Sequence, residues 1–96
     1  MDDPLKPEKM HQIQIVTGDE TSRGRYSNSM MVSHSADEFM LDWLLNSPNG
    51  AHLLSRIIVS PAHVKRIISA LKENLDNYEK QFGPVREIHV GDQKFH

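Results

Sequence analysis

Polar and apolar positions divide the chain into a first part that is rich in predicted strands and a long helix that follows it. Across residues 61–82 the apolar residues recur every three or four positions, which predicts an amphipathic helix with one buried stripe. Ser60 and Pro61 are typical of a helix start, and Gly83 with Pro84 is typical of a helix end. The stripe consists of Val64, Ile67, Ile68, Leu71, Leu75, Tyr78 and Phe82.

Before the helix, polar and apolar residues alternate with period two, which predicts strands. We expect strands at residues 11–16, 26–34 and 53–59, with a polar loop at residues 17–25 and a turn at residues 46–50. With one further strand, discussed next, this order predicts an α+β protein. It would consist of a small antiparallel meander of about four strands, followed by one long C-terminal helix that crosses one face of the sheet.

The stretch 39–45 admits two interpretations. Ser35, with Glu38 three residues later, fits a capping box that would begin a helix. The alternation within the stretch fits a strand instead, which would form a hairpin that turns at residues 36–37 with the strand before it. We favour the hairpin because its register places the apolar residues of both strands on one face: His34 opposite Phe39, Val32 opposite Leu41, and Met30 opposite Trp43.

The two ends of the chain differ from its middle. Residues 1–10 carry two prolines and alternating charges, so we expect a disordered arm there and a single domain over residues 11–96. Residues 85–90 suit a short edge strand or a packed tail. The sequence contains no cysteine, no apolar segment typical of a signal peptide and no run long enough to span a bilayer, so we expect a cytoplasmic protein.

The composition indicates a soluble protein with a small core. Hydrophobic residues make up 38% and charged residues 25% of the 96 residues, and the formal net charge is −2. A core of this kind favours self-association, and we expect a dimer or tetramer. One helix covers only one face of a sheet, so we expect the other face, with Met31, Met40 and Leu44, to be the oligomer contact.

The order of several short segments resembles a family of short prokaryotic proteins known as domain of unknown function 3467 (DUF3467). The resemblance covers roughly residues 11–90, and the family's usual Pro-Gly pair is replaced here by Pro48-Asn49-Gly50. It implies no activity, and it favours a strand over a helix for residues 39–45. The segments that carry the resemblance are Tyr26–Asn28, Ser33–Ser35, Glu38–Asp42, Arg56–Pro61, His63, Lys65–Arg66, Ala70–Asn74, Tyr78–Glu79 and Phe82–Gly83.

No arrangement of residues typical of an active site is present in the sequence. The six histidines show no metal-ligand spacing, and there is no nucleophile elbow or phosphate-binding glycine loop, so we expect no enzyme, no metal and no cofactor. Asp42 and Arg56 each interrupt an apolar strand, and a cross-strand ion pair would explain both residues.

Two small basic groups are candidates for contact with an anion or a partner. His63, Lys65 and Arg66 follow the helix start, where free N–H groups favour anions. The second group, in the preceding loop, consists of Arg23, Arg25 and Tyr26, and arginine and tyrosine both stack on bases. The alternative without any function is that these residues are ordinary solvated surface positions.

These observations favour a non-enzymatic protein-interaction or adaptor module that acts as an oligomer and binds a further, unidentified protein. Four strands followed by a helix are also similar to the order in the export chaperone SecB, so a chaperone that holds unfolded chains is the first alternative. A nucleic-acid-binding regulator that uses the helix start and the arginine loop is the second. The net charge of −2 argues against that alternative.

Overall fold

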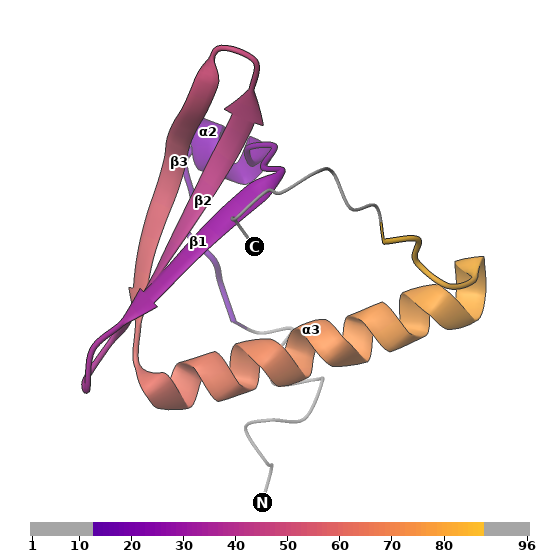
Figure 1. Ribbon diagram of the computed structural model, residues 1–96. Coiled ribbons are helices and arrows are strands. Elements are labelled where there is room, and N and C mark those ends of the chain that lie inside the picture. Colours follow the sequence, from indigo (N-terminus) through magenta and orange to yellow (C-terminus); the bar gives the residue numbers. More distant parts are fainter. Residues whose placement is uncertain (1–12, 88–96) are drawn as a thin grey trace, which may run out of the picture.

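The computed structural model describes residues 13–87, which form a three-stranded antiparallel sheet and two helices (Figure 1). A short helix α2 (Asp19–Arg23) precedes the sheet, which contains β1 (Ser29–His34), β2 (Phe39–Ser47) and β3 (Gly50–Val59) in the order β1-β2-β3. The long helix α3 (Pro61–Phe82) follows. The α+β class, the antiparallel sheet and the C-terminal helix are therefore confirmed.

The hairpin of β1 and β2 has the register that the sequence predicts. His34 is opposite Phe39, Val32 is opposite Leu41 and Met30 is opposite Trp43. The rings of His34 and Phe39 stack with their centroids 5.3 Å apart, next to the turn. Ser35 N donates to Glu38 O at 2.9 Å and closes that turn, so the pair that resembled a capping box belongs to a hairpin.

The expected fourth strand is not found. Residues 13–16 form no strand, and residues 11 and 12 lie outside the described part of the chain, as does the predicted arm at residues 1–10. The alternating pattern of residues 11–16 shows which side chains a strand would bury, but it does not determine whether the segment pairs with an edge of the sheet. With three strands, the four-strand meander and the strand order similar to SecB are not confirmed.

Two loops are also more ordered or shorter than expected. Residues 19–23 of the predicted polar loop form α2, and the predicted turn at residues 46–50 shrinks to Pro48 and Asn49 between two strands. Gly50 begins β3 with φ 114°, a backbone conformation that glycine adopts without strain. No strand is present at residues 85–87, and the rest of the expected tail strand lies outside the described residues.

Helix α3 begins and ends where the sequence predicts. The Ser60 hydroxyl accepts a hydrogen bond from His63 N at 3.1 Å, and Pro61 occupies the first turn. At the other end Gly83 has φ 91° and its N–H donates to Glu79 O at 2.8 Å.

The position of α3 differs from the expectation that it crosses one face of the sheet. The helix starts at the end of β3 and runs away from the sheet, so that its C-terminal half is well separated from the strands (Figure 1). The reason is the connection, since only Ser60 lies between β3 and α3, and a helix usually needs several linking residues to fold back. The apolar stripe is present on α3, but the expectation that the sheet buries it is wrong, because most of its side chains are exposed.

Candidate functional site

The described chain has a very small core, centred on β2. Leu41 and Leu44 are its only buried apolar residues among those described, each 7% exposed, and Asp42 between them is 8% exposed. Most of the other large apolar side chains of the sheet and of α3 are exposed. A surface of this kind is typical of a chain that buries its apolar side chains against partners.

Asp42 and Arg56 form the predicted cross-strand ion pair. They are directly opposite in the register of β2 and β3, and Arg56 Nε and Nη2 donate to Asp42 Oδ1 and Oδ2 at 2.8 and 3.0 Å. The hydrogen bonds from Arg56, helped by its charge, hold the pKa of Asp42 below its usual value although burial opposes this. The pair therefore satisfies a nearly buried carboxylate and has a structural role.

Asn28 extends the pairing of β1 and β2 by one step through its side chain. Its Nδ2 donates to Asn46 O at 2.9 Å, and its Oδ1 accepts from Asn46 N at 2.7 Å. Ser27 Oγ donates to Leu44 O at 2.7 Å beside it. The sequence analysis missed this network, because a side chain that imitates a paired backbone leaves no signal in the hydrophobic pattern.

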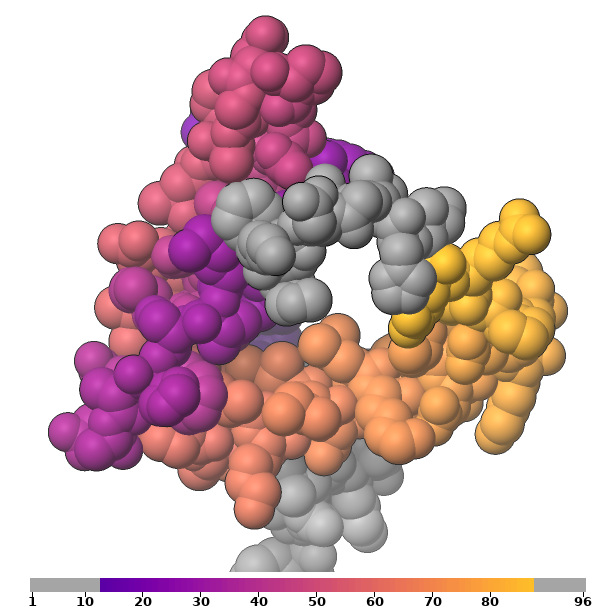
Figure 2. All heavy atoms as spheres, viewed as in Figure 1, coloured from indigo at the N-terminus to yellow at the C-terminus, as the bar shows by residue number. Residues whose placement is uncertain are grey.

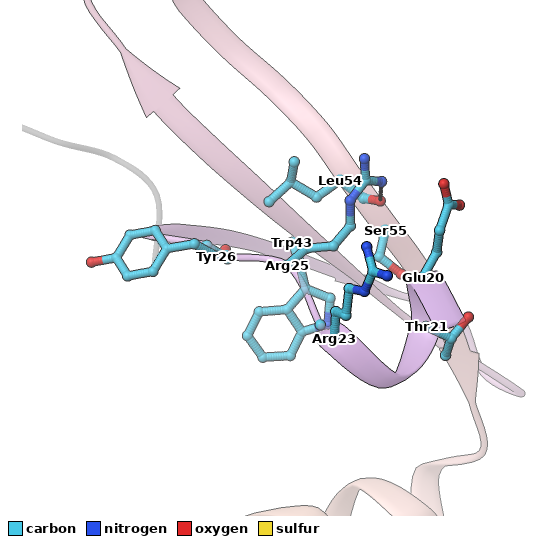
Figure 3. A pocket seen from close by; sticks show the side chains of 10 residues that line it. Glu20, Thr21, Arg23, Arg25, Tyr26, Trp43, Leu54 and Ser55 are labelled. Atoms are coloured by element: carbon cyan, nitrogen blue, oxygen red, sulfur yellow. Dashed lines mark hydrogen bonds between the residues drawn. The ribbon is translucent and has the colours of Figure 1, made fainter. Parts of the chain in front are cut away.

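A hollow of about 960 Å³ lies between α2 and one face of the sheet (Figure 3). Trp43 is opposite the small Ser55, which leaves space above β3, and Arg23 extends over that space from the end of α2. A bulge in β3 leaves Leu54 without a partner in β2, and its carbonyl accepts from Arg25 Nη1 at 3.2 Å. The sequence could not reveal this hollow, because it depends on the register and on the bulge.

The structure does not bring the two predicted basic groups together. Arg23 and Arg25 line the hollow, while Tyr26 at its rim is 80% exposed and points away from the arginines (Figure 3). His63, Lys65 and Arg66 belong to the first turns of α3, beyond the opposite end of β3. Ser60 follows Leu54 by six positions of extended chain, so the groups are roughly 20 Å apart along the strand.

Within the group at the start of α3, most contacts are local. His63 N donates to Oγ of the N-cap residue Ser60, and Arg66 Nη2 lies 3.5 Å from His63 Nδ1. Lys65 forms no hydrogen bond or ion pair with any of residues 13–87. Neither basic group therefore shows a prepared anion site.

The two edges of the sheet differ in how they are protected. β3 carries a bulge and the charge of Arg56, and both features discourage pairing with another chain. β1, with the sequence Ser-Met-Met-Val-Ser-His, has no lysine, arginine, proline or bulge. Within the described part of the chain β1 pairs only with β2, so its outer side is an edge open to a further strand.

The predicted oligomer face is only partly exposed. Met31, Met40 and Leu44 share one face of the sheet, as the alternation predicts. Met31 is 49% exposed and Met40 is half-buried, but Leu44 is buried and is not available for contact. Ile58 of β3 is paired with Met40 of β2 and is 56% exposed, so it belongs to the same surface.

Among the described elements, α3 carries the most exposed large apolar side chains, and they belong to its apolar stripe. In the space-filling view α3 forms an arm, whose orange and yellow C-terminal half lies away from the strands (Figure 2). Within the stripe, only Val64 and Ile67, near the start of α3, are half-buried. The side chains that remain 47–66% exposed are Ile68, Leu71, Leu75, Tyr78 and Phe82.

Residues 13–87 contain no group of three or more histidine, aspartate or glutamate side chains placed to hold a metal ion. Among the helices of that same range, none is both long and apolar enough to cross a membrane.

Comparison with known proteins gives a family but no activity. The family model described as "Protein of unknown function (DUF3467)" matches residues 1–87. No curated protein and no solved structure matches the chain.

Proposed function

Since the chain belongs to the DUF3467 family of proteins of unknown function, we propose from its surfaces that it is a protein-interaction or adaptor module. In this proposal it is not an enzyme, it acts as an oligomer, and it binds an extended segment of a further protein as an added strand at β1. The observation that carries the proposal is the unprotected outer edge of β1 beside a sheet with almost no core.

The geometry of the hairpin identifies the groups that would bind the added strand. Ser35 N donates to Glu38 O and closes the turn, and hydrogen-bonded and outward-facing residues alternate along β1 from there. The N–H and C=O groups of Met30, Val32 and His34 therefore point to the free edge. They would supply affinity through backbone hydrogen bonds.

The side chains of β1 determine the kind of segment that fits. Val32 is 51% exposed on one face and Met31 is 49% exposed on the other, while the edge carries no charged aspartate, glutamate, lysine or arginine. An extended segment that is uncharged at its centre and apolar at alternate positions would cover both side chains. Methionine adapts its shape to different apolar neighbours, which suits such a contact.

Two variants of β1 and one matched control test this proposal in the host cell. Val32→Pro removes an outward N–H, which an edge strand tolerates, and Val32→Lys places a charge on the edge. Ile57→Lys is the control. Leu41 pairs with Val32 on one side and with Ile57 on the other, so Val32 and Ile57 share a face of the sheet, and their exposed fractions are similar, 51% and 46%. All three variants are first checked for folding by circular dichroism.

The tagged full-length chain is then isolated from its host and its co-purifying proteins are quantified by mass spectrometry. We expect one dominant partner that is retained by the wild type and Ile57→Lys and lost with both Val32 variants. A broad set of unrelated proteins would support a holding chaperone instead. Recovery of nucleic acid, or binding of a second copy of the chain at β1, would also contradict the adaptor proposal.

A further inference from the structure

The stripe of α3 has a stricter spacing than an ordinary amphipathic helix requires. Apart from Ile67, which lies beside the seam at a g position, the steps between its apolar residues from Val64 to Phe82 are four, three, four, three and four. This is the 3.5-residue repeat of a two-helix seam. In heptad terms, Ile68, Leu75 and Phe82 occupy the a positions, and Val64, Leu71 and Tyr78 occupy the d positions. Such a seam fits another helix better than it fits a sheet.

We propose that the stripe of α3 is covered by α3 of a second copy of this chain, in antiparallel orientation. This inference rests on the proposed function only in assuming an oligomer, since it uses a surface different from the β1 edge. The arguments for it are the sizes of the side chains, the charges beside the seam and the area available.

Side-chain size favours the antiparallel orientation. In that orientation each a residue faces a d residue, which pairs Val64 with Phe82, Ile68 with Tyr78 and Leu71 with Leu75 of the second copy. Every layer then combines either a small with a large side chain or two leucines, so the layers have similar volumes. A parallel pair would place Phe82 against Phe82 and Val64 against Val64, which gives layers of unequal width.

Charge also favours the antiparallel orientation. Lys65 and Glu79 are both at e positions, and e positions of antiparallel helices face each other, so Lys65 of each copy would meet Glu79 of the other. Glu79 Oε2 accepts from Val85 N at 2.8 Å, which leaves Oε1 for this contact. In a parallel pair the e positions would face Ile67, Asn74 and Gln81 at g, and none of these is charged.

The same orientation explains why α3 begins with basic residues. Its first turn has no acidic residue, and Lys65 and Arg66 follow, which is unfavourable beside the positive end of a helix dipole. In an antiparallel pair these charges lie near the negative end of the other helix. Lys72 would meet its own counterpart at the centre, but Asp76 lies 3.1 Å from its ammonium group and offsets that charge.

The area is sufficient for a specific interface. Five side chains of the stripe are 47–66% exposed. An aromatic side chain carries on the order of 200 Å² and an isoleucine or leucine side chain less. A pair of helices would therefore cover roughly 500 Å² per copy and about 1,000 Å² in total, which is where specific interfaces begin. Contacts of each helix with the other copy's sheet would add to this area.

Charge reversal with rescue tests the pairing on the full-length chain. Lys65→Glu and Glu79→Lys each turn two attractive contacts of the dimer into repulsive ones, and the double variant restores the attraction. Lys80→Glu and Glu73→Lys are matched controls at f positions, which face away from the seam. Light scattering after size exclusion gives the mass, and a dilution series gives the dissociation constant of the dimer.

We expect the wild type and both controls to have twice the mass of one chain or a higher even multiple. Each seam variant should weaken the dimer by on the order of tenfold or more, and the double variant should recover most of the loss. A wild type with the mass of one chain, or a double variant no stronger than the single ones, would overturn the inference. Binding of a different protein by the stripe would do the same, whereas loss of partner binding through β1 would leave it intact.

Discussion

Asp42 and Arg56 face each other across β2 and β3 and are joined by two hydrogen bonds of 2.8 and 3.0 Å. The carboxylate shares its face of the sheet with the buried Leu44, while the guanidinium extends along the surface and its side chain is 50% exposed. The pair thus allows an acidic residue within the small core. It also fixes the register of β2 and β3 on the side of the bulge towards α3.

Replacing Arg56 by methionine should lower the melting temperature, because it leaves the carboxylate of Asp42 in the core without its partner. Arg56→Lys should recover only part of the loss, since an ammonium group cannot donate two parallel hydrogen bonds. Arg86→Met is the control, because Arg86 forms no ion pair within residues 13–87. Thermal unfolding followed by circular dichroism measures the difference, and equal melting temperatures for Arg56→Met and the wild type would contradict this role.

The same ion pair predicts how stability depends on pH. Hydrogen bonds from Arg56 hold the pKa of Asp42 below its usual value, so the folded state binds this proton less readily than the unfolded chain. The contribution of the pair is therefore complete above about pH 4 and is lost as the pH falls through the lowered pKa. Below about pH 4 the melting temperature of the wild type should fall more steeply than that of Asp42→Asn. Parallel curves for the two proteins would show that the pair does not cause the effect.

Asn28→Ala should destabilise the chain by about 1–2 kcal/mol, because it removes both hydrogen bonds to the backbone of Asn46. Asn28→Asp should cost a similar amount, since its second oxygen would face the carbonyl of Asn46. Asn77→Ala on α3 is the control for the loss of an amide. The free energy of unfolding in urea measures the effect, and an Asn28→Asp variant as stable as the wild type would refute the proposed geometry.

Ser60→Ala should cost about 1 kcal/mol, since it removes the hydroxyl that accepts from His63 N at the start of α3. Ser69→Ala in the middle of the same helix should be neutral or slightly stabilising, because alanine favours helices more than serine does. Helix content and urea unfolding of both variants measure the difference. Equal stability of the two variants would mean that the cap does not hold the helix start.

The sequence allowed the local structure to be predicted because each element carries its own signals. Ser60, Pro61 and Gly83 mark the ends of α3, and the agreement of two alternating patterns gives the register of β1 and β2. The ion pair of Asp42 and Arg56 could be predicted for the same reason, since each charge interrupts an apolar strand.

The arrangement of the elements could not be predicted in the same way. The stripe of α3 shows that a face needs cover, but a one-residue link prevents the chain's own sheet from providing it along most of the helix. The hollow beside Trp43 depends on a bulge at Leu54 and on the contact of Arg25 with its carbonyl, neither of which leaves a pattern in the sequence. Periodicity therefore predicts which side chains share an apolar face, but not what covers that face.

Disulfide formation between two introduced cysteines tests the pairing of α3 most directly, because the chain has no cysteine of its own. Two tagged forms, one with Lys65→Cys and one with Glu79→Cys, are expressed together and oxidised mildly. Antiparallel pairing predicts that the disulfide joins the two different forms, and that neither form expressed alone gives a comparable yield of linked dimer. No linkage between the two forms, or efficient linkage of either form with itself, would contradict the antiparallel pair.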